Sequence, residues 1–119
     1  MYATGSTSLA VNTLRLRASN VLNNKSGLLF WSHSPNGTPF QGGFMCCQPP
    51  VKRTPIQPSG GNPPPDDCSG AFAFHWNNAY VNALGLSVGD WYYCQYWSRD
   101  PGVPSTTNLT DALRFLLTP

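Results

Sequence analysis

Charged side chains are scarce in this chain of 119 residues, where they make up 10% of the positions, and glutamate does not occur at all. The seven lysines and arginines are scattered along the sequence and give a net charge of +2. Proteins that follow a phosphate backbone need dense positive charge. The composition therefore argues against nucleic acid as a partner, and it leaves five aspartates as the candidate catalytic carboxylates.

Long apolar runs are absent as well. The longest is GLLFW at 27–31, whereas a membrane-spanning helix needs about 20 apolar residues. The first ten residues lack the basic and apolar regions of a signal peptide. We expect no membrane partner, and we expect any export signal and neighbouring domains to lie outside this sequence.

Residues that favour helices are few, whereas the chain has 12 prolines and 11 glycines. A chain so rich in proline could be disordered. Hydrophobic residues at 40% and aromatic residues at 13% nevertheless supply enough apolar surface for a core. The length suits one folded domain over residues 1–119.

Apolar and polar residues alternate in several segments, which is typical of half-buried strands. Leu14, Leu16 and Ala18, for example, alternate with Arg15 and Arg17. Short strands with turns between them predict a single all-β domain, an antiparallel β-sandwich of jelly-roll or immunoglobulin-like type. Further strands are predicted within 27–34, 44–48, 69–77, 89–99 and 110–118.

The segments between these strands are less regular. Residues 35–43 are predicted to form turns. Residues 48–67 form one long proline-rich loop, and the cysteines on both sides of it suggest that it folds back onto the domain rather than acting as a linker. The last segment has an alternative, because Thr110 or Asp111 could begin a helical turn there.

Four cysteines, an even number in a small chain, predict an oxidising compartment and two disulfides. A zinc site would usually take its ligands from two short Cys-x-x-Cys arms. Here Cys46 and Cys47 are adjacent, and Cys68 and Cys94 lie 26 residues apart. Because neighbouring residues of a strand point to opposite faces, we expect Cys47 to pair with Cys68 around the loop and Cys46 to pair with Cys94 in the core.

The most aromatic segment, at 89–99, predicts a strand with two different faces. A disulfide at Cys94 would make the face that it shares with Tyr92 and Tyr96 the core face. The rings at the two ends of the opposite face would stand about 20 Å apart, a length that spans several sugar rings. That opposite face holds Trp91, Tyr93, Gln95, Trp97 and Arg99.

Such a row of rings suits a carbohydrate. A flat aromatic surface covers the apolar C–H face of a sugar, while amide and guanidinium groups such as those of Gln95 and Arg99 hydrogen-bond the hydroxyls at its edge. Trp31 could widen this surface from a neighbouring strand, although a place in the core is favoured for it. Alternatively, both faces of the strand are buried, or the rings form a protein interface.

Several segments carry a resemblance: GSTSLAVNTLRLRASN at 5–20, GLLFWS at 27–32, FQGGFMCC at 40–47, GDWYYCQYWSRDPG at 89–102 and TNLTDALRF at 107–115. Together they resemble the all-β domain often found at the C-terminus of large secreted bacterial proteins. In that family a strand ending in Gln-x-Trp-x-Arg-Asp leads into a turn and a final strand, and no single activity is assigned to the domain. The positions of Trp91 and Tyr93 are usually small or polar there, so this chain is unusually aromatic.

The aromatic face also makes the domain similar to the β-sandwich carbohydrate-binding modules of bacterial cellulases. That similarity implies a polysaccharide partner. It also implies that the domain is linked, in the full-length protein, to a catalytic domain or another secreted domain.

Catalytic groups are hard to find. A glycosidase needs two carboxylates on either side of the scissile bond, but Asp66 and Asp67 are neighbours and Asp90 and Asp100 lie at predicted turns. Oxidative cleavage by copper would need clustered imidazoles, and the chain has only two histidines. We expect no enzyme and no cofactor, except that Asp66, Asp67 or Asp100 could bind a structural calcium ion together with backbone carbonyls.

The sequence therefore predicts a secreted, non-catalytic carbohydrate-binding domain whose ligand is a β-glucan, such as cellulose or a related plant polysaccharide. The alternative is a structural or adhesive domain of a secreted or cell-surface bacterial protein that uses the same aromatic residues for contacts with other domains. A third hypothesis, that the aromatic residues stack on single-stranded nucleic acid, has less support, because the grooves that bind such strands are strongly basic.

Overall fold

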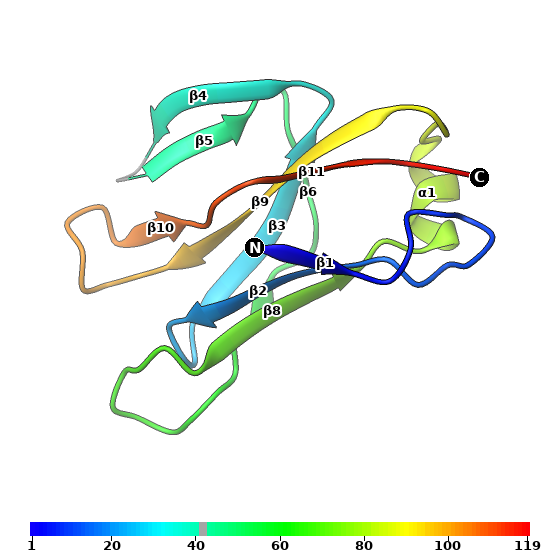
Figure 1. The fold of residues 1–119 in the computed structure, drawn as a ribbon. Helices are drawn as coiled ribbons and strands as arrows, with labels where there is room; N and C mark the ends of the chain where they lie inside the picture. Colours follow the sequence, from blue (N-terminus) through cyan, green and yellow to red (C-terminus); the bar gives the residue numbers. More distant parts are fainter. Residues whose placement is uncertain (41–42) are drawn as a thin grey trace.

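The computed structural model describes residues 1–40 and 43–119, and it shows two antiparallel β-sheets packed together (Figure 1). The first sheet has the order β1-β2-β8, formed by Tyr2–Thr4, Arg15–Val21 and Gly70–His75. The second has the order β10-β9-β3-β6, formed by Thr107–Leu109, Trp91–Arg99, Ser26–Ser32 and Lys52–Arg53. In addition, β11 (Leu113–Leu116) pairs with β9 and β7 (Gln57–Pro58) pairs with β3. The predicted all-β sandwich is confirmed.

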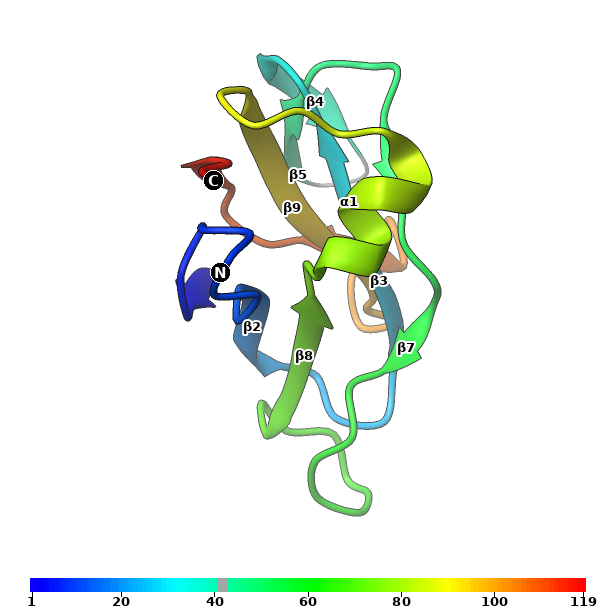
Figure 2. The same ribbon diagram turned by 90° about the vertical axis from the view of Figure 1, so that its right-hand side faces the viewer.

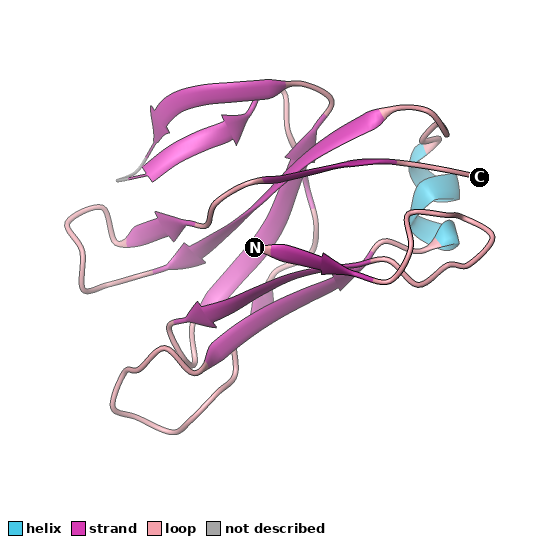
Figure 3. Ribbon diagram, viewed as in Figure 1, coloured by secondary structure: helices cyan, strands magenta, loops and turns pink. Residues whose placement is uncertain are grey.

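A separate hairpin and a short helix complete the described part of the chain. The hairpin consists of β4 (Pro35–Phe40) and β5 (Gly43–Cys47), which pair with each other as a two-stranded sheet (Figure 3). The helix, α1 (Asn78–Leu84), follows β8 (Figure 2).

The core lies between the two sheets and follows the predicted alternation. In and beside β2, Leu14, Leu16 and Ala18 are all buried, whereas Arg15 and Arg17 on the opposite face are only half-buried. The neighbouring strand β8 of the same sheet contributes aromatic side chains with the same two-residue period. Burying each large apolar side chain stabilises the fold by about 1.5 to 3 kcal/mol.

Tyr96 of β9 connects the two sheets. Its ring stacks on that of Phe72 in β8, with the ring centroids 5.4 Å apart, and its hydroxyl donates to the carbonyl oxygen of Leu16 at 2.6 Å. Gly27 of β3 makes room for this contact, because a Cβ there would lie 2.4 Å from the ring of Phe72. Burial raises the pKa of the Tyr96 phenol, so the hydroxyl keeps its proton and remains a donor.

The structure differs from the sequence prediction at two segments. Residues 78–84 form a helix that was not predicted: the side chain of Asn77 accepts from the backbone N–H of Tyr80 at 2.8 Å, and Gly85 ends the helix at a φ of 63°. Residues 35–40 form a strand instead of turns. Most of its side chains are exposed, so it has no buried face that an alternating pattern could reveal.

The last segment had two alternatives, and it is a strand. Residues 113–116 form β11, which pairs with the first half of β9, and Phe115 lies opposite Tyr92. Phe115 is 6% exposed and stacks on that ring. The helical turn at Thr110 or Asp111 is therefore absent.

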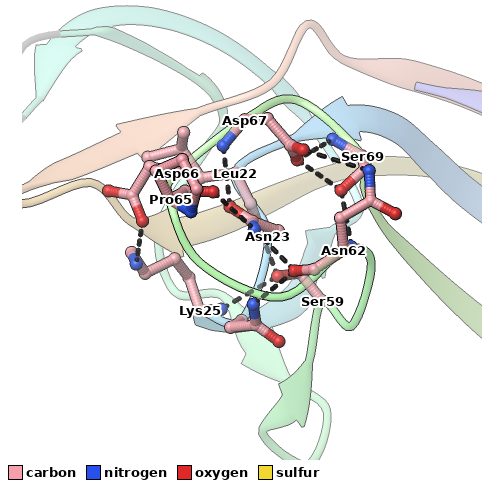
Figure 4. A network of polar contacts seen from close by, with 10 residues as sticks. Leu22, Asn23, Lys25, Ser59, Asn62, Pro65, Asp66, Asp67 and Ser69 are labelled. Atoms are coloured by element: carbon pink, nitrogen blue, oxygen red, sulfur yellow. Dashed lines mark hydrogen bonds and ion pairs between the residues drawn. The ribbon is translucent and has the colours of Figure 1, made fainter.

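The proline-rich loop folds back onto the domain, as predicted. Two short strands within it, β6 and β7, pair with β3. After these strands, the loop is hydrogen-bonded to the fully buried side-chain amide of Asn23 (Figure 4). Its nitrogen donates to the carbonyl oxygens of Asn62 and Pro65 at 2.7 and 3.2 Å, and its oxygen accepts from the backbone N–H of Asp67 at 2.9 Å.

The four cysteines form no disulfide, and the two predicted pairs, Cys47 with Cys68 and Cys46 with Cys94, are wrong. Cys94 is fully buried and faces the core, whereas the backbone of Cys46 contacts the other side of β9 through Gln95. Cys47 is buried, and its thiol donates to the carbonyl oxygen of Tyr93. Cys68 is exposed in the loop that Asn23 holds.

We expect the native protein to show a fast-reacting thiol at Cys68 when it is titrated with 5,5′-dithiobis(2-nitrobenzoate) at about pH 8. Burial raises the pKa of Cys47 to about 12 and that of Cys94 well above its usual value, so neither forms the reactive thiolate until the protein unfolds. Cys68→Ser should remove the fast phase. A native protein without any reactive thiol would contradict this prediction and return the disulfide pairing to consideration.

Candidate binding face on β9

The two faces of β9 differ as the sequence predicts. Tyr92, Cys94 and Tyr96 are all 0% exposed and face the core. On the opposite side, which we call the outer face of β9, the exposure is uneven. Trp91 is 44% exposed and Arg99 is exposed, whereas Tyr93 and Trp97 are half-buried.

Gln95, in the middle of the outer face, is not available to a ligand, which corrects the prediction. It is 1% exposed because β5 crosses this face. Its amide nitrogen donates to the carbonyl oxygens of Phe44 and Thr110 at 2.8 and 2.6 Å, and its oxygen accepts from the backbone N–H of Cys46 at 3.0 Å. The predicted row of rings is therefore divided by β5 into an end at Trp91 and an end at Trp97.

The strand that covers Gln95 brings its own exposed aromatic residue. Phe44 of β5 is 63% exposed, although its carbonyl oxygen accepts a hydrogen bond from the Gln95 amide. Phe44 was not among the residues predicted from the sequence. In the sequence, Phe44 follows glycines at 42 and 43 and is not part of an alternating pattern. Nothing in the sequence therefore distinguishes it from a core residue.

Trp31 does not widen the outer face, so its selection as a possible ligand contact is wrong, and the core position that was favoured for it is confirmed. In the sheet, Trp31 lies opposite Cys94 and so shares its core face. Its indole is 1% exposed, its N–H donates to the hydroxyl of Tyr80 at 2.7 Å, and its ring contacts those of Trp76 and Tyr92 edge-on.

A groove lies at the Trp97 end of the outer face. It has a volume of about 280 Å³. Phe30, which lies opposite Gln95 in the sheet, contributes to its floor, and Ile56 at 69% exposure stands open to solvent. The lining is apolar except for one guanidinium and consists of Leu28, Phe30, Phe40, Met45, Val51, Arg53, Ile56 and Trp97.

Each tryptophan of the outer face contacts an arginine side chain. The guanidinium carbon of Arg99 lies 5.1 Å from the ring centroid of Trp97, and that of Arg114 lies 5.1 Å from the ring centroid of Trp91. Arg114 comes from β11, where it lies opposite Tyr93 and therefore points to the same face. Arg99 was predicted from the sequence, but Arg114 was not, because only the pairing of β11 with β9 brings Arg114 to this face.

The two carboxylates of the proline-rich loop are bound to neighbouring side chains. Asp66 pairs with Lys25 at 2.9 Å, and Asp67 accepts hydrogen bonds from the side chain and backbone of Ser69 and from Asn62, which lower its pKa. Within residues 1–40 and 43–119, no three side chains of histidine, cysteine or aspartate gather in a way that could hold a metal ion.

Similarity to known proteins does not identify the ligand. Comparisons with models of protein families, with curated proteins and with solved structures find no match for this chain. In the described part of the chain, no helix has the length and apolar character needed to cross a membrane. The function has to be inferred from the geometry of the β9 face.

Proposed function

We propose that this domain is a non-catalytic carbohydrate-binding module whose outer β9 face binds an extended polysaccharide with a β-glucan backbone. One observation carries the proposal: Trp97 lines an open groove while Trp91, on the same face of the same strand, is 44% exposed. Indole rings cover the apolar faces of sugar rings, and the neighbouring guanidinium groups can donate to sugar hydroxyls.

The spacing supports an extended ligand. Trp91 and Trp97 are six residues apart on a continuous strand, which corresponds to about 20 Å. Because β5 crosses between them, the two rings would contact different sugars of one chain, with exposed Phe44 on the crossing strand. A short oligosaccharide would reach only one of these contacts.

The positions of the aspartates support binding without hydrolysis. Asp90 and Asp100 flank the nine-residue strand β9, so they stand about 30 Å apart. The two carboxylates of a glycosidase are about 5 to 10 Å apart. We infer that such a domain would keep a secreted partner domain close to its substrate.

Trp97→Ala and Trp91→Ala should each weaken binding to soluble β-glucan by about tenfold, because a stacked ring contributes about 1 to 2 kcal/mol. Retardation in β-glucan gels and pull-down with insoluble cellulose, xylan and chitin would measure this. Tyr2→Ala is the matched control: Tyr2 is 46% exposed, but it lies on β1 of the other sheet, so its replacement should leave binding unchanged.

The apolar groove favours one alternative, a structural or adhesive domain that contacts other domains of the same secreted protein. Ile56, Met45 and Val51 would suit a protein side chain as well as a sugar. If the wild-type domain is retained by none of the polysaccharides, the carbohydrate proposal fails and this alternative is favoured.

A further inference from the structure

The charged side chains that share the outer face of β9 are all positive. Arg99 belongs to this face by its position in β9, and Arg114 lies opposite Tyr93. Arg53 lies opposite Phe30, which itself lies opposite Gln95, so it points to the same side of the sheet. All three arginines are exposed.

None of these arginines forms an ion pair with a carboxylate in the described part of the chain. Among the residues that the structure describes, the ion pairs join Lys25 to Asp66 and the amino group of Met1 to Asp111. None involves an arginine. Asp90 and Asp100 flank β9 without pairing to an arginine in this part of the chain.

Each guanidinium lies beside a ring that could contact a sugar. The guanidinium carbons of Arg99 and Arg114 lie 5.1 Å from the ring centroids of Trp97 and Trp91, within the range of a cation–π contact. A sugar stacked next to the indole would present its substituents to the N–H groups of the arginine. Two parallel N–H donors match the two oxygens of a carboxylate better than they match a single hydroxyl.

We propose that the polysaccharide bound at this face is acidic, with carboxylates on its sugar rings that Arg53, Arg99 and Arg114 recognise. This inference rests on the proposed carbohydrate binding and specifies its ligand class. The tryptophans contact the ring faces, and the arginines select rings that carry a negative charge.

The test compares two soluble polymers with the same β-1,4-glucan backbone, carboxymethyl cellulose and hydroxyethyl cellulose, by retardation in affinity gels and by calorimetry. The wild-type domain should bind the carboxymethyl polymer about tenfold more tightly, since hydrogen bonds between charged groups are stronger than those to hydroxyls. This preference should shrink as salt rises from about 0.05 to 0.5 M. Poly-glutamate, an anionic polymer without sugar rings, should bind at least about tenfold more weakly than carboxymethyl cellulose.

Arginine variants locate the effect. The double variant Arg99→Gln with Arg114→Gln should reduce the preference for the carboxymethyl polymer to about threefold or less. The matched control, Arg15→Gln with Arg17→Gln, removes the same charge from β2 of the other sheet and should keep the preference. A thermal melt of each variant shows whether it is folded.

The outcomes separate the two proposals. Equal binding of the two glucan polymers would overturn the inference but leave carbohydrate binding intact. Equal binding of poly-glutamate and carboxymethyl cellulose, or equal loss in both double variants, would overturn it as well, since charge alone would then explain the attraction. Failure of both glucan polymers to bind would contradict the proposed function itself.

Discussion

Replacing Tyr96 by alanine is expected to lower the free energy of unfolding by about 3 to 5 kcal/mol, the usual cost of removing a buried aromatic side chain. Tyr96 is 0% exposed, its ring stacks on Phe72, and its hydroxyl satisfies the carbonyl oxygen of Leu16. The variant loses contacts to both sheets. Chemical denaturation of the wild type and the variant measures the difference.

Trp91→Ala is the matched control, since it removes a larger ring from the same strand. Its side chain is 44% exposed and contacts Arg114, so the loss should stay below about 1 kcal/mol. Equal destabilisation by the two substitutions would contradict the assignment of the faces of β9. The binding site would then have to be sought elsewhere.

Replacing Asn23 by alanine should lower the free energy of unfolding by about 2 to 4 kcal/mol, because it removes a fully buried amide that makes three hydrogen bonds to the loop. The lost amide serves two carbonyl oxygens and one N–H of the loop, at Asn62, Pro65 and Asp67. The loop should also become sensitive to proteolysis between residues 60 and 68. Denaturation and limited digestion followed by mass spectrometry report the two effects.

Asn24 provides the comparison within the same turn. Its side chain also donates to the carbonyl oxygen of Asn62, at 2.7 Å, but the residue is exposed. Asn24→Ala should cost less than about 1 kcal/mol, because water can replace the lost donor. If Asn23→Ala were as mild as Asn24→Ala, the loop would not depend on the buried amide.

Alternation predicted the strands with one buried and one exposed face. It placed Leu16 in the core before any pairing was known, because a strand has a side-chain period of two. It also put Tyr96 on the same face as Cys94, but the choice of that face as the core rested on a disulfide that does not form. The same argument could not place β4, most of whose side chains are exposed, and it treated Gln95 as a surface residue. The burial of Gln95 depends on β5, a strand about 50 residues away in the sequence whose approach leaves no local pattern.

Long-range geometry also explains the remaining differences. Disulfide pairing depends on which loops lie close together in the fold. The alternation of side chains along a strand left several cysteine pairings open. Arg114 and Arg53 reach the candidate face only through the register of β11 and β6. Trp91, Tyr93 and Trp97 could thus be predicted from the sequence, whereas Phe44, Arg53 and Arg114 could not.

The Gln95 amide joins the β4–β5 hairpin to the sandwich in an unusual way. The hairpin is a sheet of its own and forms no ladder with β9; the side chain of Gln95 bonds to the carbonyl oxygen of Phe44 and the N–H of Cys46, as a neighbouring strand would. Attachment through side chains, those of Gln95 and of Cys47, whose thiol bonds to the carbonyl oxygen of Tyr93, imposes no strand register. The hairpin, which forms one wall of the groove, could therefore be exchanged for a hairpin of another length, in evolution or by engineering. Such an exchange would change the ligand preference and leave the core unchanged.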